Sequence, residues 1–485
     1  MAAPESQAGT VALLRRLAGA APIETQGALV FVGTDTVWKL RKAIRLPFLD
    51  FTTLTERRRT ARRELELNQP HAPQMYRDVV PVTRTDAGVE LDGPGEAVDW
   101  VLRMAPVPAA DFLDAMAARG ALTPALLDAL GDAVAAYHAA LKPLTLDPVA
   151  ALAEVITGSH TAALAAGLDS AAVAAWTTAA QAALDRDATL LRARARAGFV
   201  RRCHGDLHLG NLCLWHGRPT PFDALEFDET LASIDTGYDL AFLLMDLEQR
   251  ADRDAANRVL NRYVGRSGDA GVVAAMGLYQ SLRAMVRAHV EARSGNAERS
   301  ATYLARATAA LRPQAARVLA IGGLPGTGKS TLARLLAPAL GLPPGALVLR
   351  SDEIRKRLAG VAPETRLPAA AYTPAASAAV FAELAAMTAT AIAAGHPVIA
   401  DATFMSPQHR AAVRAAAGAA PFLGIWLHAP LPVLEARVAA RHADASDADL
   451  AVLHSAAAHD PGAGDWQPVA AGERDAALAA IRMLL

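Results

Sequence analysis

Apolar and polar positions alternate with different periods along the chain, and the periods predict its elements. Short apolar runs at 28–32 and 36–40 flank a Gly33-Thr34-Asp35 turn and predict two strands of a hairpin. A charged segment at about 53–68 predicts a helix, and the run at 99–104 predicts a further strand. This part of the chain therefore combines a small sheet with a helix.

In the rest of the chain, the spacing of apolar residues changes twice. Residues from roughly 108 to 311 are mainly helical in pattern, with an interruption after 200. Pro313 should end the last of these helices, which places a boundary between 312 and 317. From 317 to 485 strands and helices alternate, as in a parallel sheet. We therefore predict a mixed α/β and α+β protein with domains at 1–312 and 317–485.

Composition narrows the class of protein. Hydrophobic residues make up 52% and charged residues 20%, which is ordinary for a globular protein. There are 48 Lys and Arg residues against 49 Asp and Glu, and 14 against 13 within 317–485, so nucleic acid is an unexpected partner. The first residues lack the pattern of a signal peptide, and we find no uninterrupted apolar run of about 18 residues. These features predict a cytoplasmic enzyme without a membrane span.

One eight-residue run predicts nucleotide binding. It fits GxxxxGK[ST], follows an apolar strand at 317–321 and precedes a helix. Its glycines let backbone N–H groups point at phosphates, while the lysine neutralises the phosphates and the serine hydroxyl holds Mg²⁺. The predicted ATP-binding residues are Gly323, Leu324, Pro325, Gly326, Thr327, Gly328, Lys329, Ser330 and Thr331.

A second site is predicted by His204-Gly205-Asp206-Leu207-His208-Leu209-Gly210-Asn211, followed by Asp223. An Asp, four residues, an Asn and a later Asp match the catalytic loop of protein kinases. Asp206 would orient and deprotonate an acceptor hydroxyl, and Asn211 and Asp223 would ligate Mg²⁺. The alternative is a loop of capping residues that matches by accident.

The HGDxHxxN form resembles the aminoglycoside phosphotransferase family, which has the protein-kinase-like fold. The resemblance implies a small lobe at about 20–105 and a large lobe at about 106–312. It also implies that Lys39 binds phosphates and that a helix glutamate holds this lysine, with Glu64 preferred to Glu66. The full GxGxxG loop of protein kinases is absent from the sequence.

Glu226 follows the predicted metal ligand Asp223 within Phe222-Asp223-Ala224-Leu225-Glu226. It would either contact a polyhydroxylated or amino-bearing acceptor or form part of a charged surface.

In the second domain, the strand at 346–349 leads into Arg350-Ser351-Asp352, and Arg355 lies three residues further on. This arrangement resembles small P-loop kinases such as gluconate kinases, zeta-toxin-like kinases and the kinase domain of polynucleotide kinases. The resemblance implies that Asp352 accepts the proton of the acceptor and that Arg355 fixes the substrate. The alternative is a helix cap followed by a basic surface.

The run 397–401 ends in Asp401 and has the form of a Walker B strand, whose carboxylate reaches Mg²⁺ through water. Ala402 follows where motor ATPases usually carry a glutamate, so transfer to an acceptor is favoured over work driven by hydrolysis. Arg437 and Arg441 are one helical turn apart and would clamp the transferring phosphate or lie on a solvated face.

Pairing these two domains resembles a bacterial two-domain family of largely unassigned substrate. We expect an ATP- and Mg²⁺-dependent kinase with two active sites and a small hydroxyl-bearing acceptor, such as a sugar, aminosugar or aminocyclitol. The alternatives are a single catalytic domain with a nucleotide-sensing or substrate-presenting partner, or a C-terminal kinase of nucleotides or nucleotide sugars.

Overall fold

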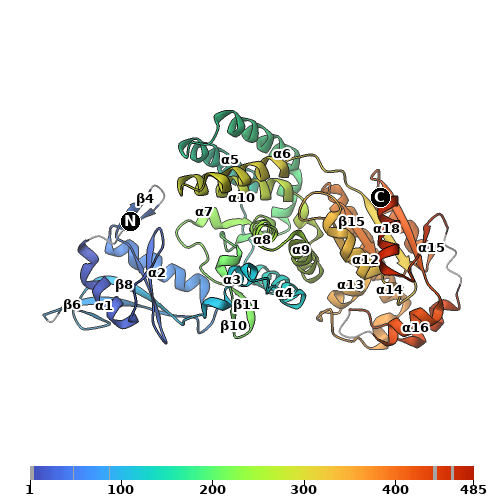
Figure 1. The fold of residues 1–485 in the computed structure, drawn as a ribbon, viewed down its shortest axis with the longest axis horizontal. Coiled ribbons are helices and arrows are strands. Elements are labelled where there is room, and N and C mark those ends of the chain that lie inside the picture. Colours follow the sequence, from blue (N-terminus) through green and yellow to red (C-terminus); the bar gives the residue numbers. More distant parts are fainter. Residues whose placement is uncertain (1–4, 47–48, 87, 441–444, 460–463) are drawn as a thin grey trace. The chain divides into compact units, whose positions relative to one another are not determined.

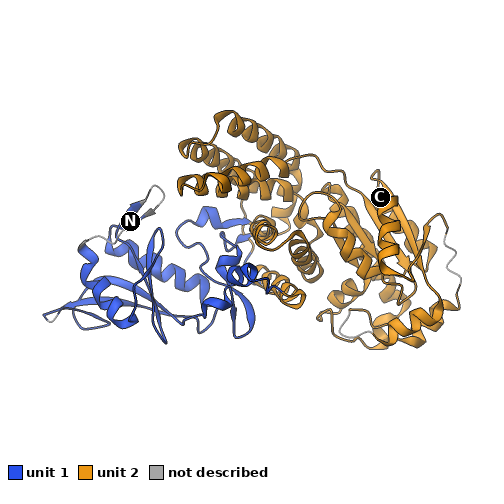
Figure 2. Ribbon diagram, viewed as in Figure 1, with its two compact units in different colours: residues 1–122, 140–142, 201–234 blue, residues 123–139, 143–200, 235–485 orange. Residues whose placement is uncertain are grey.

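The computed structural model describes residues 5–46, 49–86, 88–440, 445–459 and 464–485. It contains two compact units, coloured separately in Figure 2. Unit 1 comprises residues 1–122, 140–142 and 201–234, and unit 2 comprises residues 123–139, 143–200 and 235–485.

Unit 1 is built on a six-stranded antiparallel sheet in the order β1-β2-β3-β8-β6-β7. Its strands β6 and β8 are labelled in the blue part of Figure 1. Its strands are β1 (Ile23–Glu24), β2 (Ala28–Val32), β3 (Val37–Arg41), β6 (Tyr76–Thr85), β7 (Gly88–Leu91) and β8 (Glu96–Met104). The helices α1 (Ala8–Ala18) and α2 (Leu54–Asn68) pack against strands of this sheet. The hairpin, the charged helix and the strand predicted from the sequence are all present.

Apolar burial and capping explain two of these helices. Leu13 and Leu14 of α1 pack into one core cluster with Phe31 and Leu40 of the sheet. Helix α2 begins after Thr53, whose hydroxyl accepts a hydrogen bond from the Glu56 N–H and so satisfies one exposed helix donor.

The remainder of unit 1 forms short elements around a hairpin. They include η1 (Glu5–Gln7), β4 (Arg45–Leu46), β5 (Leu49–Asp50), η2 (Ala109–Asp111), α3 (Leu113–Ala118), β9 (Val200–Arg202), η3 (Leu209–Asn211), β10 (Leu212–Trp215), β11 (Arg218–Pro221), α7 (Glu229–Ala232) and β12 (Ser233–Asp235). Strands β10 and β11 pair antiparallel, with Leu212 opposite Pro221. This register brings the two ends of the predicted catalytic segment together.

The first part of unit 2 is helical. Its elements are α4 (Pro124–Ala140), α5 (Pro148–Ala165), α6 (Ser170–Arg196), α8 (Thr236–Arg250), α9 (Arg253–Ser267), η4 (Ala270–Val273), α10 (Met276–Arg293) and α11 (Ala297–Ala310). Trp176 of α6 is fully buried, and its indole N–H donates to the Ser281 hydroxyl of α10 at 2.9 Å. Buried pairs of this kind fix the helices against one another.

The second part of unit 2 is a five-stranded parallel sheet in the order β14-β15-β13-β16-β17. Its strands are β13 (Val318–Gly323), β14 (Leu347–Arg350), β15 (Val398–Asp401), β16 (Phe422–His428) and β17 (Gln467–Ala470). The helical elements are α12 (Lys329–Leu336), η5 (Ala337–Ala339), α13 (Ser351–Leu358), η6 (Ala369–Tyr372), α14 (Pro374–Ala393), α15 (Pro407–Ala416), α16 (Leu431–Ala439), α17 (Leu450–Ala457) and α18 (Arg474–Leu484). The predicted mixed fold with a parallel C-terminal sheet is confirmed.

The compact units do not follow the boundary predicted at 312/317. The helices of unit 2 belong with the parallel sheet because α9 packs directly on β14 and α13. The domain boundary predicted at 312/317 marks where the pattern of elements changes along the sequence, and as a domain boundary it stays a prediction.

Among the described residues, one helix, α14, is long and apolar enough to cross a membrane by length and composition alone. Its residues Val380, Leu384 and Met387 are buried in the structure. A core helix passes the same test, so the finding is weak and the predicted absence of a membrane span stays a prediction.

Candidate active sites

The first candidate site lies within unit 1 and centres on Lys39. This lysine is on β3, and its Nζ lies 2.7 Å from Glu64 Oε1 of α2 and 2.5 Å from Asp223 Oδ1. Glu64 is fully buried, whereas Glu66 is exposed and pairs with Arg63. The structure thus places Glu64, and not Glu66, against the lysine.

Arg41 extends this cluster, two residues along the same strand. Its guanidinium forms ion pairs with Glu64 and, at 2.5 Å, with Glu226 Oε1. Residues two apart in a strand point to the same face, so Arg41 and Lys39 share the carboxylates around them. One oxygen each of Glu64, Asp223 and Glu226 lies within 4.8 Å of the others, and the two cations offset much of the negative charge of these three carboxyl groups.

The pKa values follow from this charge balance. Burial alone would lower the pKa of Lys39, but the charges of Asp223 and Glu64 raise it above the ordinary value. Burial alone would raise the pKa of Asp223, but Lys39 and Arg41 hold it well below its usual range. Lys39 and Asp223 are therefore both charged at neutral pH.

Glu226 is not a surface charge, which was one of its two predicted roles. Its side chain is only 5% exposed, and burial raises the pKa of its carboxyl. Its pairing with Arg41 gives it a structural role in the cluster, while contact with an acceptor stays a prediction.

Two residues that sequence reasoning missed hold the backbone at Asp223. The Asp223 N–H donates to the Tyr76 hydroxyl at 2.9 Å, and the Ala224 N–H donates to Asn68 Oδ1 at 3.0 Å. Asp223 itself has φ of 59°, a left-handed conformation that is costly for a residue with a side chain. These two hydrogen bonds help to keep the carboxylate aimed at the lysine.

The catalytic segment is folded around Asp206 and Asn211. Asn211 Nδ2 donates to the Asp206 carbonyl oxygen at 3.0 Å and to Asp206 Oδ2 at 3.1 Å. The Phe222 N–H donates to the Asn211 carbonyl at 3.1 Å across the β10–β11 hairpin, which brings the segments of Asn211 and Asp223 together. The Asp206 side chain is 45% exposed and thus accessible to an acceptor.

The residues present fit a magnesium ion at this site. The Asn211 amide nitrogen is occupied by Asp206, which leaves its oxygen as the candidate ligand, and Asp223 offers an ionised carboxylate. Such hard oxygen donors, together with phosphate oxygens, suit Mg²⁺.

The second candidate site lies at the carboxyl ends of β13, β14 and β15. The loop between β13 and α12 has the left-handed glycines Gly326 (φ 85°) and Gly328 (φ 87°), a backbone conformation that side chains disfavour. Lys329 Nζ donates to the carbonyl oxygens of Gly323 and Leu324, both at 3.0 Å. The Ser330 hydroxyl donates to Asp401 Oδ2 at 2.5 Å.

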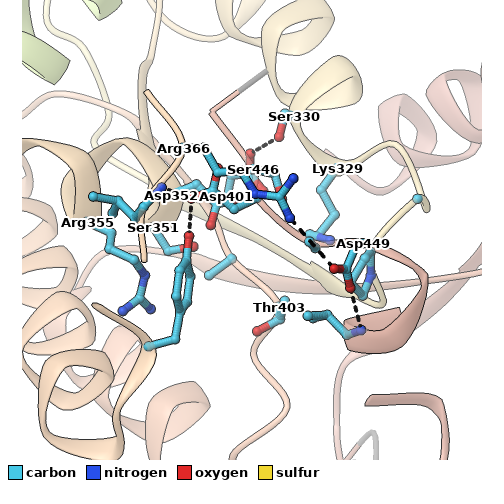
Figure 3. A pocket seen from close by; sticks show the side chains of 18 of the residues that line it. Lys329, Ser330, Ser351, Asp352, Arg355, Arg366, Asp401, Thr403, Ser446 and Asp449 are labelled. Atoms are coloured by element: carbon cyan, nitrogen blue, oxygen red, sulfur yellow. Dashed lines mark hydrogen bonds and ion pairs between the residues drawn. The ribbon is translucent and has the colours of Figure 1, made fainter. Parts of the chain in front are cut away.

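Asp352 faces the same pocket, whose volume is about 540 Å³. In Figure 3, Lys329 and Arg355 lie at opposite ends of the view, with Asp352 and Asp401 between them. Burial raises the pKa of Asp352, and the negative charge of Asp401 adds to this effect. The predicted base, the P-loop residues Lys329 and Ser330 and the Walker B carboxylate are therefore brought together.

Arg355 lies in the wall of this pocket. One guanidinium nitrogen donates to the Ala371 carbonyl at 2.7 Å, and the guanidinium lies 4.7 Å from the Tyr372 ring centroid. On the same wall, Asp447 forms an ion pair with Lys356 and accepts hydrogen bonds from the Tyr372 hydroxyl and, at 3.0 Å, the Leu367 N–H. Sequence reasoning gave Asp447 no such role.

Arg437 of α16 lies beside the phosphate-binding loop. Its guanidinium donates to the carbonyl oxygens of Ala471 at 2.8 Å, Gly472 at 2.6 Å and Gly326 at 3.4 Å. These backbone contacts brace the loop, and the clamp on the transferring phosphate stays a prediction. Arg441 lies outside the described residues.

Arg350 is a buried neighbour that the sequence analysis passed over. Its Nη1 lies 2.7 Å from Glu353 Oε1, and its Nε lies 3.3 Å from Asp401 Oδ2. The guanidinium therefore fixes the Walker B carboxylate from the end of β14.

Comparisons with known proteins define the class. The family described as "Phosphotransferase enzyme family" matches residues 30–275, and the one described as "AAA domain" matches residues 318–459. The chain belongs to the phosphotransferase enzyme family and joins its phosphotransferase domain to a C-terminal P-loop domain. The chain is 30% identical over 462 residues to the uncharacterized protein Rv2004c of Mycobacterium tuberculosis. This match covers 91% of this chain and 90% of that protein.

Two solved structures are similar to separate parts of the chain. A gluconokinase from Sinorhizobium meliloti 1021 is 21% identical, with a TM-score of 0.26, and the match covers 36% of this chain and 94% of that one. A putative fructosamine-3-kinase from Thermobifida fusca is 20% identical, with a TM-score of 0.37, and the match covers 64% of this chain and 100% of that one.

Proposed function

We propose that the protein uses ATP and Mg²⁺ at two kinase-type active sites to phosphorylate hydroxyl groups of a small molecule, such as a sugar, aminosugar or aminocyclitol. The observation that carries the proposal is that each unit holds its own candidate base, its own lysine and carboxylates that could hold a metal. Unit 1 contains Asp206 and Lys39, and Asp352 and Lys329 line the pocket of unit 2.

In the first site, Asp206 orients the acceptor hydroxyl and takes its proton as the phosphoryl group is transferred. Lys39, held by Glu64, binds phosphate oxygens. Asn211 and Asp223 would hold Mg²⁺, which neutralises charge on the phosphates when bound.

In the second site, Asp352 is the base, and Lys329 and the loop N–H groups bind the phosphates. Ser330 and Asp401 would hold the metal, and Arg355 would bind the acceptor. Ala402 is buried where a motor ATPase usually carries a glutamate, which favours transfer to an acceptor over hydrolysis. Such an enzyme would work where ATP is available, in the cytoplasm.

The test is a phosphotransfer screen with radiolabelled ATP on the full-length protein. The acceptors are sugars, sugar acids, aminosugars, aminocyclitols, nucleosides and nucleotide sugars. Wild type, Asp206→Asn and Lys329→Ala are compared in parallel. Each variant should abolish a different labelled product, with losses of roughly 10²-fold or more in kcat.

If one variant removes every product and the other removes none, a single domain is catalytic and the two-site proposal fails. Labelling of nucleotides or nucleotide sugars alone would instead support the alternative of a C-terminal nucleotide-type kinase.

A further inference from the structure

Strand β14, which leads to Asp352, is an outer strand of the parallel sheet, and within the described part of the chain β15 is its one neighbouring strand. The Leu347 N–H points inward and donates to the Pro397 carbonyl at 3.0 Å. Successive backbone groups of a strand point to alternate sides, so the Ala346 carbonyl and the Val348 N–H point outward. In an edge strand such groups need other partners.

Two asparagines of α9 are those partners. Asn261 Oδ1 accepts from the Val348 N–H at 2.6 Å, and Asn261 Nδ2 donates to the Ala346 carbonyl at 3.3 Å. Asn257, only 3% exposed, donates to the Ala346 carbonyl at 3.0 Å and to the Pro344 carbonyl at 3.1 Å. The Asn261 side-chain amide thus pairs with β14 as the backbone of a neighbouring strand would.

The same helix also holds the segment that follows α13. Arg262 Nη1 of α9 lies 2.7 Å from Glu364 Oε1, and Arg266 Nη1 donates to the Val361 carbonyl at 3.2 Å. Arg262 is itself anchored to Asp132 of α4 at 2.6 Å. Helix α9 therefore secures the chain both before and after the short helix that carries Asp352.

We propose that Asn261, a residue of the part matched by the phosphotransferase family, is a positioning residue for Asp352 in the P-loop site. It fixes the backbone of β14 four residues before the base and so sets where the carboxylate stands relative to Lys329. This inference rests on the proposed role of Asp352 as a base. It makes the P-loop reaction depend on a helix of the preceding domain.

The test uses full-length protein carrying Asp206→Asn, so that turnover reports the P-loop site. The probe is release of inorganic phosphate from Mg²⁺–ATP with water as the acceptor, in which Asp352 takes the proton of the water. Asn261→Ala is compared with Asp254→Asn, an exposed position on the same helix. Hydrogen exchange of the backbone amides is measured on the same samples.

Asn261→Ala should lower kcat about tenfold while the KM for ATP stays within about twofold, because it moves the base and leaves the nucleotide contacts intact. The Val348 amide should exchange faster, while β15 stays protected. Asp254→Asn should change none of these quantities. In an Asp352→Asn background, Asn261→Ala should have no further effect on kcat, since the two residues act as one unit.

Four results would overturn the inference. Unchanged exchange at Val348 would show that the hydrogen bond does not hold the strand. Faster exchange with unchanged kcat, or an effect that adds fully to that of Asp352→Asn, would leave Asn261 a structural residue only. If Asp352→Asn alone leaves kcat unchanged, the proposed role of Asp352 as the base is wrong, and so is the inference about Asn261. If Asp352→Asn lowers kcat but Asn261→Ala does not, the inference about Asn261 alone is wrong.

Discussion

The Ser330 hydroxyl and the Asp401 carboxylate are joined by a 2.5 Å hydrogen bond, although 71 residues separate them in the chain. They meet because β13 and β15 are parallel neighbours, with Ile321 opposite Asp401. The loop after β13 then brings Ser330 back to the carboxyl ends of these strands. Two hard oxygen donors are thereby brought together beside Lys329, as a phosphate-bound magnesium ion requires.

The first prediction concerns nucleotide stoichiometry. Calorimetric titration of the full chain with ATP in Mg²⁺ should show two sites, because Asn211 with Asp223 and Ser330 with Asp401 form separate sets of donors. Lys329→Ala removes the cation of the P-loop and should leave one site. A single site in the wild type that persists in Lys329→Ala would contradict nucleotide binding at the P-loop.

The second prediction separates chemistry from binding. Asp352→Asn preserves the shape of the side chain but cannot accept a proton. Transfer by the P-loop site should fall about 10²–10⁴-fold, while the Kd for ATP stays nearly constant. Rates are measured in the Asp206→Asn background. If transfer continues at the rate of that background, Asp352 is not the base and the base lies elsewhere.

The third prediction concerns pH. Burial raises the pKa of Asp352, and the active form of a base is the ionised carboxylate. Activity of the P-loop site should therefore fall as the pH drops through this raised pKa, at a higher pH than the value of about 3.9 for an ordinary aspartate. The profile of kcat against pH tests this. An acid limb at the ordinary aspartate value would contradict the buried setting of the base.

The fourth prediction concerns stability. Arg41→Met leaves Glu64 and Glu226 buried without this partner and should destabilise the fold by about 3–5 kcal/mol in urea denaturation. Replacing Glu226 by Gln in the same protein should restore part of the loss. Arg45→Met is the matched control, because Arg45 is exposed beside Asp50 and water already screens this ion pair, so its loss should leave the stability nearly unchanged. Equal effects at the two arginines would contradict a buried charge cluster.

Most of the site residues that the sequence could predict belong to local motifs. The P-loop and the loop of Asp206 and Asn211 each fit within eight residues, so spacing alone predicted their shape. Strand β6 was missed because Pro81 lies within it, and proline rarely occurs inside a sheet. The register of β6 shifts between Val82 and Thr83, next to this proline.

The parts of the sites that the sequence did not predict depend on contacts between segments that are distant in the chain. Arg41 could have been noticed, because it directly follows the predicted strand 36–40 and lies two residues from Lys39, on the same face if the strand is extended by one residue. Tyr76 and Asn68 gave no such signal, since their role depends on where the Asp223 backbone passes. The sequence left Arg437 either as a phosphate clamp or on a solvated face, and it could not show the contacts with the carbonyls of Gly326 and Ala471, which come from distant segments.

The side-chain amides that cover β14 should also keep this strand edge from pairing with another copy of the chain. A fragment beginning at residue 317 would lack α9 and would expose the outward Ala346 carbonyl and Val348 N–H on a strand of sequence Leu-Val-Leu-Arg. An apolar strand edge of this kind pairs readily with another copy. The isolated C-terminal domain should therefore aggregate where the intact chain does not, and a gene encoding it alone would need another way to cover that edge.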